Sequence, residues 1–582
     1  MTLALVAALA LSAAPPPSPA DAAFETLTRD YLNEFGKYSP VSATQLGEHR
    51  FDAELDDLSA EGRAAALAWT RSWLERLHKL DRKHLSRANQ ADAAILENQL
   101  RAADFYETKL QDWAWNPLVY TGLAGDALYS LLAREYAPLP QRLVAVAGRL
   151  EKLPRLLEQE RANLALARVP AIHAETAVKQ NPGVLSLVDE LVVPNLKVLP
   201  DADRARLEKA IAGAKAALAE HQKWLEGTMK PAAKGDFRIG AKLYDEKLAF
   251  SLMSPLSRQE VRHRAEAEVK RVRAEMYAVA TKALAGKPGA PPAPAKPTAA
   301  EQQAVIAAAL ELAYADRPPR DAVVETAKKT LAEATAFVRQ AGFVTVPDEP
   351  VDIIVMPEFQ RGVALAYCDS PGALDRGQRT FYAVSPIPAD WTEKQVDSFL
   401  REYNERSIAN LTLHEAMPGH YLQGAHANRA PFSLRNVFPS GSFVEGWAEY
   451  GERITIDAGF RAADPLMRLI QLKWYLRATT NAIIDSAIHV DGMTRGDAMK
   501  LMTETAFQEE REAAAKWVRA ELTSAQLSTY FVGYQEHADL RAYAEKKLGK
   551  KFRAKAYHDQ LLSYGAPPVR IVRALMFGEP IR

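Results

Sequence analysis

Two histidines and two glutamates have the types and spacing of a hydrolytic metal site. His414 and Glu415 are adjacent, His420 follows six residues after His414, and Glu445 lies 25 residues beyond His420. Imidazole and carboxylate are good Zn²⁺ ligands, and three protein ligands leave a fourth position open for water. The metal lowers the pKa of that water, and a neighbouring carboxylate can take its proton. We therefore predict His414, His420 and Glu445 as ligands of one zinc ion per chain and Glu415 as the general base.

The six-residue spacing of the histidines requires a break in the helix that carries them. Zinc peptidases commonly place two histidines at i and i+4 on one helical face. At roughly 100° per residue, a residue at i+6 points well away from the first. Pro418 removes a backbone donor and clashes with the preceding turn, and Gly419 tolerates unusual backbone angles. We expect these two residues to interrupt the helix and to bring His420 back toward His414.

Three glutamates share one face of a second predicted helix. Glu445, Glu449 and Glu452 are spaced i, i+4 and i+7, and the residues around them, such as Trp447, favour partial burial. Such a stripe taken alone is more often a solvated acidic face, but a buried carboxylate stripe requires a cation. We prefer Glu445 as the third ligand and expect Glu449 to orient a ligating histidine, although the two roles could be exchanged. His426 is a reserve ligand, for which an ordinary surface or core role is the more common one.

The stretch Leu413–Gln423, which reads Leu-His-Glu-Ala-Met-Pro-Gly-His-Tyr-Leu-Gln, resembles the signature of the bacterial DUF885 family. That family is similar to the helical, gluzincin-like zinc metallopeptidases with an HExxH motif. Weaker matches follow in the family's order at Ser39–His49, Ile239–Tyr244, Ile484–His489, Tyr530–Gly533 and Tyr557–Leu562. The resemblance covers roughly residues 25 to 582. It implies a mostly helical, cleft-forming fold and leaves the substrate undefined.

The resemblance also suggests which residues complete the chemistry. The oxyanion of a tetrahedral intermediate usually needs a Tyr hydroxyl, His or Arg donor besides the metal. Tyr530 is the first choice, by analogy with the C-terminal tyrosine donors of helical zinc peptidases, and His489 is the second. For each of them, a buried packing role is equally common. Asp485 lies four residues before His489, where it could orient the ring of His489 or simply cap it structurally. Candidate substrate-binding residues are Tyr382, Arg477 and His537.

Hydrophobic periodicity predicts a mainly α fold, with helices in the ranges 60–112, 138–168, 202–228, 257–285, 300–342 and 498–520. Strand signals are confined to about 350–386, at Val351–Met356, Val363–Tyr367 and Thr380–Val384. This small β-sheet would lie beside the metal-binding helix, where an edge strand can pair with an extended peptide. The Pro-rich tract Gly286–Pro297 predicts a flexible loop.

Residues 1–22 are predicted to be a signal peptide. Leu3–Ala13 is an apolar run too short to span a bilayer comfortably, and Ala20–Ala22 has the small-x-small form of a cleavage site. No Lys or Arg precedes the run, and an Ala-rich tail is the alternative. The prediction implies a periplasmic or secreted protein without stable membrane insertion after processing. Beyond this segment we expect a helical region at 23–300 and a metal-site region at 301–582, packed around one cleft.

The composition excludes some classes of function. Lys plus Arg and Asp plus Glu are 73 each, so the balance gives no support for nucleic-acid binding. Cys368 is the single cysteine, which excludes an intrachain disulfide and a cysteine-ligated zinc site.

We predict a zinc-dependent metallopeptidase that hydrolyses short peptides. Mn²⁺, Fe²⁺ or Co²⁺ would also suit two histidines and a carboxylate. One alternative is a metallohydrolase that acts on a non-peptide amide or ester. Another is a non-catalytic helical binding protein with a structural or vestigial metal site. The presence of Glu415 argues against it, because a structural site needs no base beside a ligand. The sequence leaves open the oligomeric state and the charge clamp that an exopeptidase would need.

Overall fold

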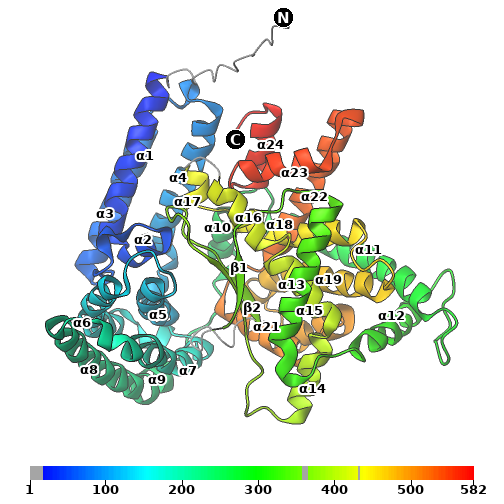
Figure 1. Cartoon of the computed structure of the whole chain (residues 1–582), viewed down its shortest axis with the longest axis horizontal. Coiled ribbons are helices and arrows are strands. Elements are labelled where there is room, and N and C mark those ends of the chain that lie inside the picture. The colour runs from blue at the N-terminus through cyan, green and yellow to red at the C-terminus, as the bar shows by residue number, and fades with distance from the viewer. Residues whose placement is uncertain (1–17, 357–364, 430–432, 582) are drawn as a thin grey trace, which may run out of the picture.

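The computed structural model describes residues 18–356, 365–429 and 433–581, and most of them are helical (Figure 1). The N-terminal helices are α1 (Pro19–Tyr38), α2 (Pro40–Leu46), α3 (Ala60–His78), α4 (Arg87–Phe105), α5 (Leu118–Leu132), α6 (Leu139–Asn163), α7 (Ala171–Leu187), α8 (Asp201–Trp224) and α9 (Lys230–Ala232). Several start where the sequence offers a cap. The hydroxyls of Ser18, Ser59 and Ser86 accept backbone N–H bonds in the first turns of α1, α3 and α4.

The remaining elements form the C-terminal part of the molecule. Its helices are α10 (Gly240–Leu252), α11 (Arg258–Leu284), α12 (Ala299–Tyr314), α13 (Val323–Ala341), α14 (Glu393–Glu402), α15 (Glu405–Glu415), α16 (His420–Arg429), α17 (Leu434–Val437), α18 (Gly441–Asp457), α19 (Pro465–His489), α20 (Arg495–Lys500), α21 (Glu510–Leu522), α22 (Ser528–Leu548), α23 (Ala554–Ser563) and α24 (Val569–Phe577). Its strands are β1 (Val351–Val355), β2 (Ala366–Asp369) and β3 (Thr380–Val384). The mainly α fold with one small sheet is therefore confirmed.

The apolar core divides earlier in the chain than the expected boundary at residue 300. One large cluster of buried side chains runs from Val41 to Ala233, and the largest runs from Tyr244 to Val572. Helices α10 and α11 belong to the second cluster, and α11 packs along the length of α19. The sequence boundary was placed at the Pro-rich tract, but that tract only connects two helices of the same core.

The three strands form a sheet of order β1-β3-β2. Strand β1 runs parallel to β3, whereas β2 runs antiparallel to it. Strand β2 is thus an edge strand of the described sheet, and its last residue, Asp369, contacts the N-terminal part of the chain. The second strand was expected from Val363, but residues 363 and 364 lie outside the described part of the chain.

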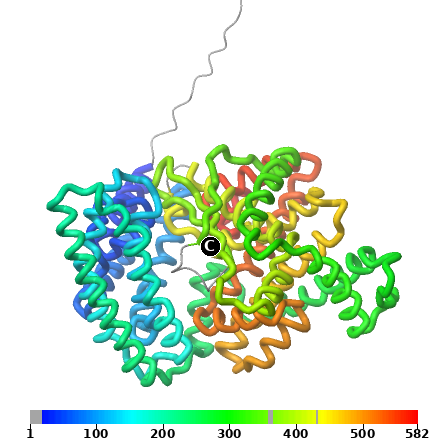
Figure 2. Tube along the Cα trace, turned by 60° about the horizontal axis from the view of Figure 1, so that its bottom comes forward, coloured from blue at the N-terminus to red at the C-terminus, as the bar shows by residue number. Residues whose placement is uncertain are grey.

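Caps and prolines interrupt two of the expected long helices, and the range 498–520 also splits, between α20 and α21. The range 60–112 splits into α3 and α4 because Asp81 and Ser86 cap new turns. The range 300–342 splits at Pro318 and Pro319 between α12 and α13. The tract 286–297 has no regular structure, as predicted, and projects beyond the helices at the right of Figure 2.

The signal-peptide prediction falls mostly on residues 1–17, which lie outside the described residues. The expected cleavage site Ala20–Ala22 lies within α1. There the buried carboxylate of Asp21 accepts hydrogen bonds from the Ser86 N–H (2.8 Å) and the Asn89 amide (2.7 Å). A cut after Ala22 would remove these contacts between α1 and α4. Among the described helices, none has the length and apolar character needed to cross a membrane.

The N-terminal helices hold the loop that follows β2. Asp369 accepts hydrogen bonds from the Tyr129 hydroxyl (2.9 Å) and from Arg134 (2.6 Å). Further along the loop, Asp375 faces the His49 ring, with 3.4 Å between Nε2 and Oδ1. The N-terminal part therefore supports one edge of the C-terminal part instead of packing only on itself.

Candidate metal centre and its cavity

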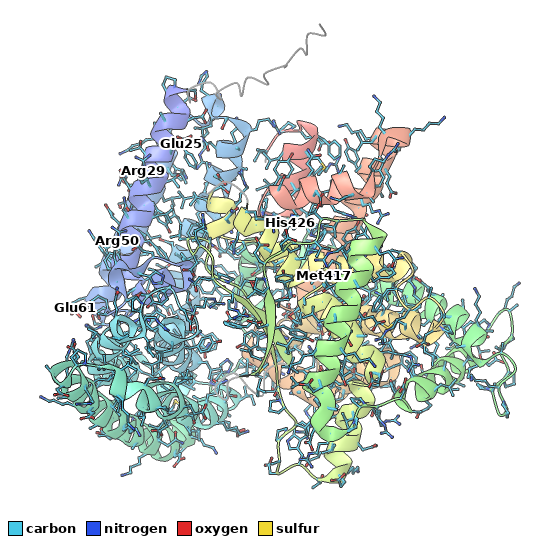
Figure 3. All side chains as sticks on the ribbon, in the orientation of Figure 1. Glu25, Arg29, Arg50, Glu61, Met417 and His426 are labelled. Atoms are coloured by element: carbon cyan, nitrogen blue, oxygen red, sulfur yellow. The ribbon has the colours of Figure 1, made fainter. Side chains whose placement is uncertain are left out.

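The helix that carries His414 ends at Glu415, and the next helix begins at His420. Gly419 is required in the break because a Cβ there would lie 1.7 Å from the His414 carbonyl oxygen. The Gly419 N–H donates to the Leu413 carbonyl (2.9 Å), and the Trp447 indole N–H donates to the Pro418 carbonyl (2.9 Å). The expected interruption at Pro418 and Gly419 is confirmed; Figure 3 labels Met417, which lies within it.

The break brings the two histidines and Glu445 together. Oε2 of Glu445 lies 3.5 Å from Nε2 of His414 and 3.5 Å from Nε2 of His420. The three candidate ligand atoms all lie within 4.8 Å of one another. Zinc–ligand distances of about 2.0–2.1 Å in tetrahedral geometry separate two ligand atoms by about 3.3–3.4 Å. Oε2 of Glu445 is buried without a hydrogen-bond partner among the described residues, so this group fits a zinc ion.

The contact that orients His414 comes from Glu452, whereas the sequence assigned it to Glu449. Nδ1 of His414 lies 2.8 Å from Oε1 of Glu452, and the other oxygen of Glu452 accepts from the Asn410 amide (2.7 Å). A carboxylate on Nδ1 places the proton there and leaves the lone pair of Nε2 facing Glu445 and His420. Glu449 and Glu452 lie on the same face of α18, but only Glu452 reaches Nδ1 of His414.

The pKa values of Glu445 and Glu449 are shifted in opposite directions. Burial alone would raise the pKa of Glu445, but the facing imidazoles of His414 and His420 outweigh it and hold that pKa well below its usual range. Burial, reinforced by the charge of Glu452, raises the pKa of Glu449 well above its usual range. Glu445 is therefore the charged carboxylate that a metal needs, whereas the neutral acid is favoured at Glu449.

Glu415 lines the cavity next to the histidine cluster. Burial and, secondarily, the charge of Glu445 raise its pKa, while His420 and His414 oppose that shift. A more basic carboxylate is a better proton acceptor, which suits a general base. Cys368 of β2 lines the same cavity, but burial raises the pKa of its thiol, so it is not an activated nucleophile.

A cavity of about 750 Å³ opens onto this cluster. Its lining comes from β2, from the loops after β2 and β3, and from helices α14, α15, α16, α17, α18, α19, α21 and α22, together with Leu365, Tyr403, Pro439 and Ala566. All lining residues lie between Leu365 and Ala566. The N-terminal part contacts this wall through Asp369 and Asp375, and the expectation that both halves of the chain surround one cleft stays a prediction.

Tyr530 is the predicted oxyanion donor that the structure brings to the cavity. Its ring centroid lies 6.5 Å from that of His414, and its hydroxyl accepts a hydrogen bond from Arg519 (2.9 Å). Helix α22 lies close to α18 because glycines meet at the crossing; a Cβ on Gly446 would lie 2.2 Å from the Gly533 backbone. Burial and the charge of Glu445 raise the pKa of Tyr530, which keeps its own proton available for donation.

His489 and Asp485 lie outside the cavity lining and have other partners than expected. Nε2 of His489 donates to the carbonyls of Ala520 (2.8 Å) and Thr523 (2.6 Å). Asp485 accepts from the backbone N–H groups of Ala525 (2.9 Å) and Ser528 (3.0 Å). The two side chains therefore anchor the end of α21 and the start of α22, which positions Tyr530 indirectly.

Four further candidates have mostly structural partners. Tyr382 is fully buried and outside the cavity lining, with its hydroxyl 3.3 Å from that of Thr412. His537 donates to the Phe443 carbonyl (3.1 Å), and burial lowers its pKa to about 4. His426, labelled in Figure 3, bonds to the Thr345 carbonyl (2.8 Å) and is no ligand of the cluster. Arg477 does line the cavity, but it pairs with Glu512 (3.1 Å).

Sequence reasoning missed Glu452, Lys516 and Arg519. The sequence does contain a signal for Glu452, because it lies at i+7 from Glu445 on the same predicted helical face. Lys516 and Arg519 line the cavity from α21, where a Lys and an Arg three residues apart look like an ordinary solvated face.

The chain belongs to the DUF885 family, a bacterial protein family of unknown function, whose model matches residues 40–576. A solved structure of a presumed lipoprotein of unknown function from Shewanella oneidensis is 31% identical, with a TM-score of 0.78, covering 95% of this chain and 99% of that one. A presumed lipoprotein from Colwellia psychrerythraea is 20% identical, with a TM-score of 0.76 over 95% of this chain and 98% of that one, and shows the fold alone. No curated protein matches the chain.

Proposed function

We propose that this DUF885 protein is a zinc-dependent metallopeptidase that hydrolyses short peptides. The observation that carries the proposal is the convergence of His414, His420 and Glu445 beside Glu415 at the wall of a cavity. A structural zinc site is normally closed by four protein ligands, whereas three ligands facing a cavity leave room for substrate. When bound, the metal would polarise the scissile carbonyl and lower the pKa of water.

The protein's own groups supply the remaining steps. Glu415 takes a proton from the attacking water and returns it to the leaving amine. The Tyr530 hydroxyl donates a hydrogen bond to the oxyanion, and it is oriented for this because its oxygen already accepts from Arg519. Glu452 holds His414 in the tautomer that a ligand needs.

Two features favour a peptide over other amides or esters. Strand β2 is an edge strand of the described sheet, and Ala366, Tyr367 and Cys368 line the cavity. An extended peptide can add to such an edge through main-chain hydrogen bonds. A volume of about 750 Å³ suits a short peptide and excludes a folded protein.

The test is hydrolysis of a mixed short-peptide library, followed by mass spectrometry, for wild type, chelator-treated protein and Glu415→Gln. Glu405→Gln, on the same helix but outside the cavity lining, is the matched control. We expect cleavage by wild type and Glu405→Gln and none by the other two. A wild-type protein that holds metal and cleaves no peptide would contradict the proposal and favour a metallohydrolase that acts on a non-peptide amide or ester.

An envelope location is proposed as well. The two similar structures carry the description of lipoproteins, which is a property of envelope proteins, and the apolar run Leu3–Ala13 fits export of this chain. Fractionation of cells that express the full chain checks this; recovery of the protein in the cytoplasmic fraction alone would contradict it.

A further inference from the structure

Helix α21 presents positive charge to the same cavity. Arg511, Glu512, Ala515, Lys516 and Arg519 all line it, so the helix faces the cavity along its length. We call Arg511, Lys516 and Arg519 the basic wall. The proposed hydrolysis uses Arg519 only to orient the Tyr530 hydroxyl, and it does not require Arg511 or Lys516.

Lys516 is a buried cation without a counter-ion. Its side chain is 5% exposed, and within the described part of the chain it forms no hydrogen bond or ion pair. Burial, with the neighbouring charges of Arg477 and Arg519, lowers its pKa well below the usual range. An isolated buried ammonium group is costly, and buried charges in proteins are normally paired.

The carboxylates around Lys516 are already engaged. Glu512, one turn earlier on α21, receives Arg477 on one oxygen (3.1 Å) and the Tyr403 hydroxyl on the other (3.0 Å). Glu445 faces the two histidines, and the neutral acid is favoured at Glu449. Lys516 is therefore left to a group that enters the cavity.

The other members of the basic wall have only neutral partners. Arg519 donates to the Tyr530 hydroxyl (2.9 Å) and to the Gln526 side-chain oxygen (3.1 Å). The guanidinium carbon of Arg511 lies 3.6 Å from the centroid of the Trp391 ring, a stacking contact that leaves its charge unbalanced.

The basic wall lies near the metal cluster. The charge of Glu445 raises the pKa of both Lys516 and Arg519 against the lowering effect of burial. Arg519 contacts Tyr530, which itself stacks toward His414. A substrate with its scissile bond at the cluster can thus place a nearby anionic group against α21.

We propose that Lys516, assisted by Arg519, binds a carboxylate of the substrate inside this cavity. The inference deepens the proposed peptidase function and rests on it for the identity of the ligand as a peptide. This binding predicts that the preferred substrates are peptides with a carboxylate close to the scissile bond. That carboxylate is either the C-terminal one, which would make the enzyme trim from the C-terminus, or an acidic side chain.

The test measures equilibrium binding by calorimetry with Glu415→Gln protein, so that turnover is not required. The probes are N-acetyl-trialanine as the free acid, the same peptide as the C-terminal amide, and a C-terminal amide with Glu in place of the middle Ala. The same titrations are repeated with Lys516→Met, Lys516→Arg and the exposed control Lys500→Met on α20, each combined with Glu415→Gln.

We expect the free acid to bind at least about tenfold more tightly than the neutral amide, as charge-assisted hydrogen bonds allow. Lys516→Met should abolish this preference, Lys516→Arg should keep most of it, and Lys500→Met should leave it unchanged. Tight binding of the Glu-containing amide would assign the site to acidic side chains. Weak binding of that amide beside a tight free acid would assign the site to the C-terminus.

Equal affinity for acid and amide, no measurable binding of the free acid, or a full preference in Lys516→Met would each overturn the inference. These outcomes are separate from those of the library experiment. A peptidase without acid preference keeps the proposed function and loses the basic-wall assignment. A protein that prefers the acid but cleaves no peptide keeps the basic-wall assignment and loses the proposed function.

Discussion

The metal cluster and the basic wall line one cavity but satisfy their charges in opposite ways. In the cluster, the second nitrogen of His414 is held by Glu452, which Asn410 holds in turn. In the basic wall, Lys516 has no hydrogen-bond or ion-pair partner among the described residues, and Arg519 has only neutral ones there. Fixed partners around the cluster suit groups that must keep their geometry during a reaction.

The difference separates chemistry from recognition. Nε2 of His414, Nε2 of His420 and Oε2 of Glu445 lie within 4.8 Å of one another, as ligands of one small ion must. The unpaired cation of the basic wall faces the wider cavity, where a flexible anionic group can reach it. Substitutions in the cluster should therefore lower kcat or metal content, whereas substitutions in the basic wall should act mainly on substrate affinity.

The largest effect is expected for His420→Ala. Loss of one of three ligands should leave the protein without stoichiometric metal and without hydrolysis. Metal per chain is measured by plasma mass spectrometry after gel filtration. The control His426→Ala, on the same helix, removes only a bond to the Thr345 carbonyl and should keep one ion per chain. Equal metal content in the two variants would contradict the ligand assignment.

Tyr530→Phe should lower kcat by about 10²–10³-fold, the cost of one oxyanion donor. KM should change little, because Arg519 and Lys516 remain. Tyr534→Phe, on the same helix but outside the cavity lining, is the matched control. Steady-state kinetics on a short peptide separate the two constants. A rise in KM alone would place Tyr530 with the basic wall instead of the cluster.

Glu452→Gln should weaken metal affinity by about 10–100-fold, as loss of a partner that orients a ligating histidine does. Glu449→Gln should have a smaller effect, because burial and the charge of Glu452 already favour the neutral acid at Glu449. Competition with a zinc chelator measures both affinities. The reverse order would return the orienting role to Glu449.

The smallest effect concerns the stability of the basic wall. Lys516→Met should raise the free energy of unfolding by on the order of 1 kcal/mol at neutral pH, because an unpaired buried charge is removed. Between the folded-state pKa of Lys516 and the ordinary lysine value of 10.5, the unfolded chain binds more protons, so wild-type stability rises with pH there. The advantage of Lys516→Met should therefore shrink toward pH 10.5. Thermal unfolding at several pH values checks this, and a destabilised variant at neutral pH would contradict it.

The metal cluster could be read largely from the sequence because its parts are local. Pro418 and Gly419 interrupt a helix by their own chemistry, and Glu445 follows on a single helical face. The orienting role was expected at Glu449 instead of Glu452 because both share that face, and only the three-dimensional position of His414 decides which one reaches it. The apolar periodicity predicts helices in the right parts of the chain. It does not predict the breaks near Ser86 and Pro318, because a cap or a proline there lies inside a long apolar pattern.

The basic wall could not be predicted because its character depends on distant residues. Lys516 is unpaired only because Glu512 is already bound by Arg477 from α19 and by Tyr403 after α14. His489 and Asp485 show the opposite failure. Their types suit catalysis, but the carbonyls and N–H groups at the α21–α22 junction engage them. Residue type alone does not distinguish a side chain that faces a cavity from one that caps a helix.

The most direct test of the metallopeptidase assignment is the single-turnover hydrolysis rate of a short peptide at matched metal content. It compares Glu415→Gln with Glu405→Gln. We predict that Glu415→Gln retains its metal and is slower by about 10²–10⁴-fold, the usual contribution of a general base. Equal rates for the two variants would contradict the assignment of Glu415 and, with it, the account of this cavity as a peptidase active site.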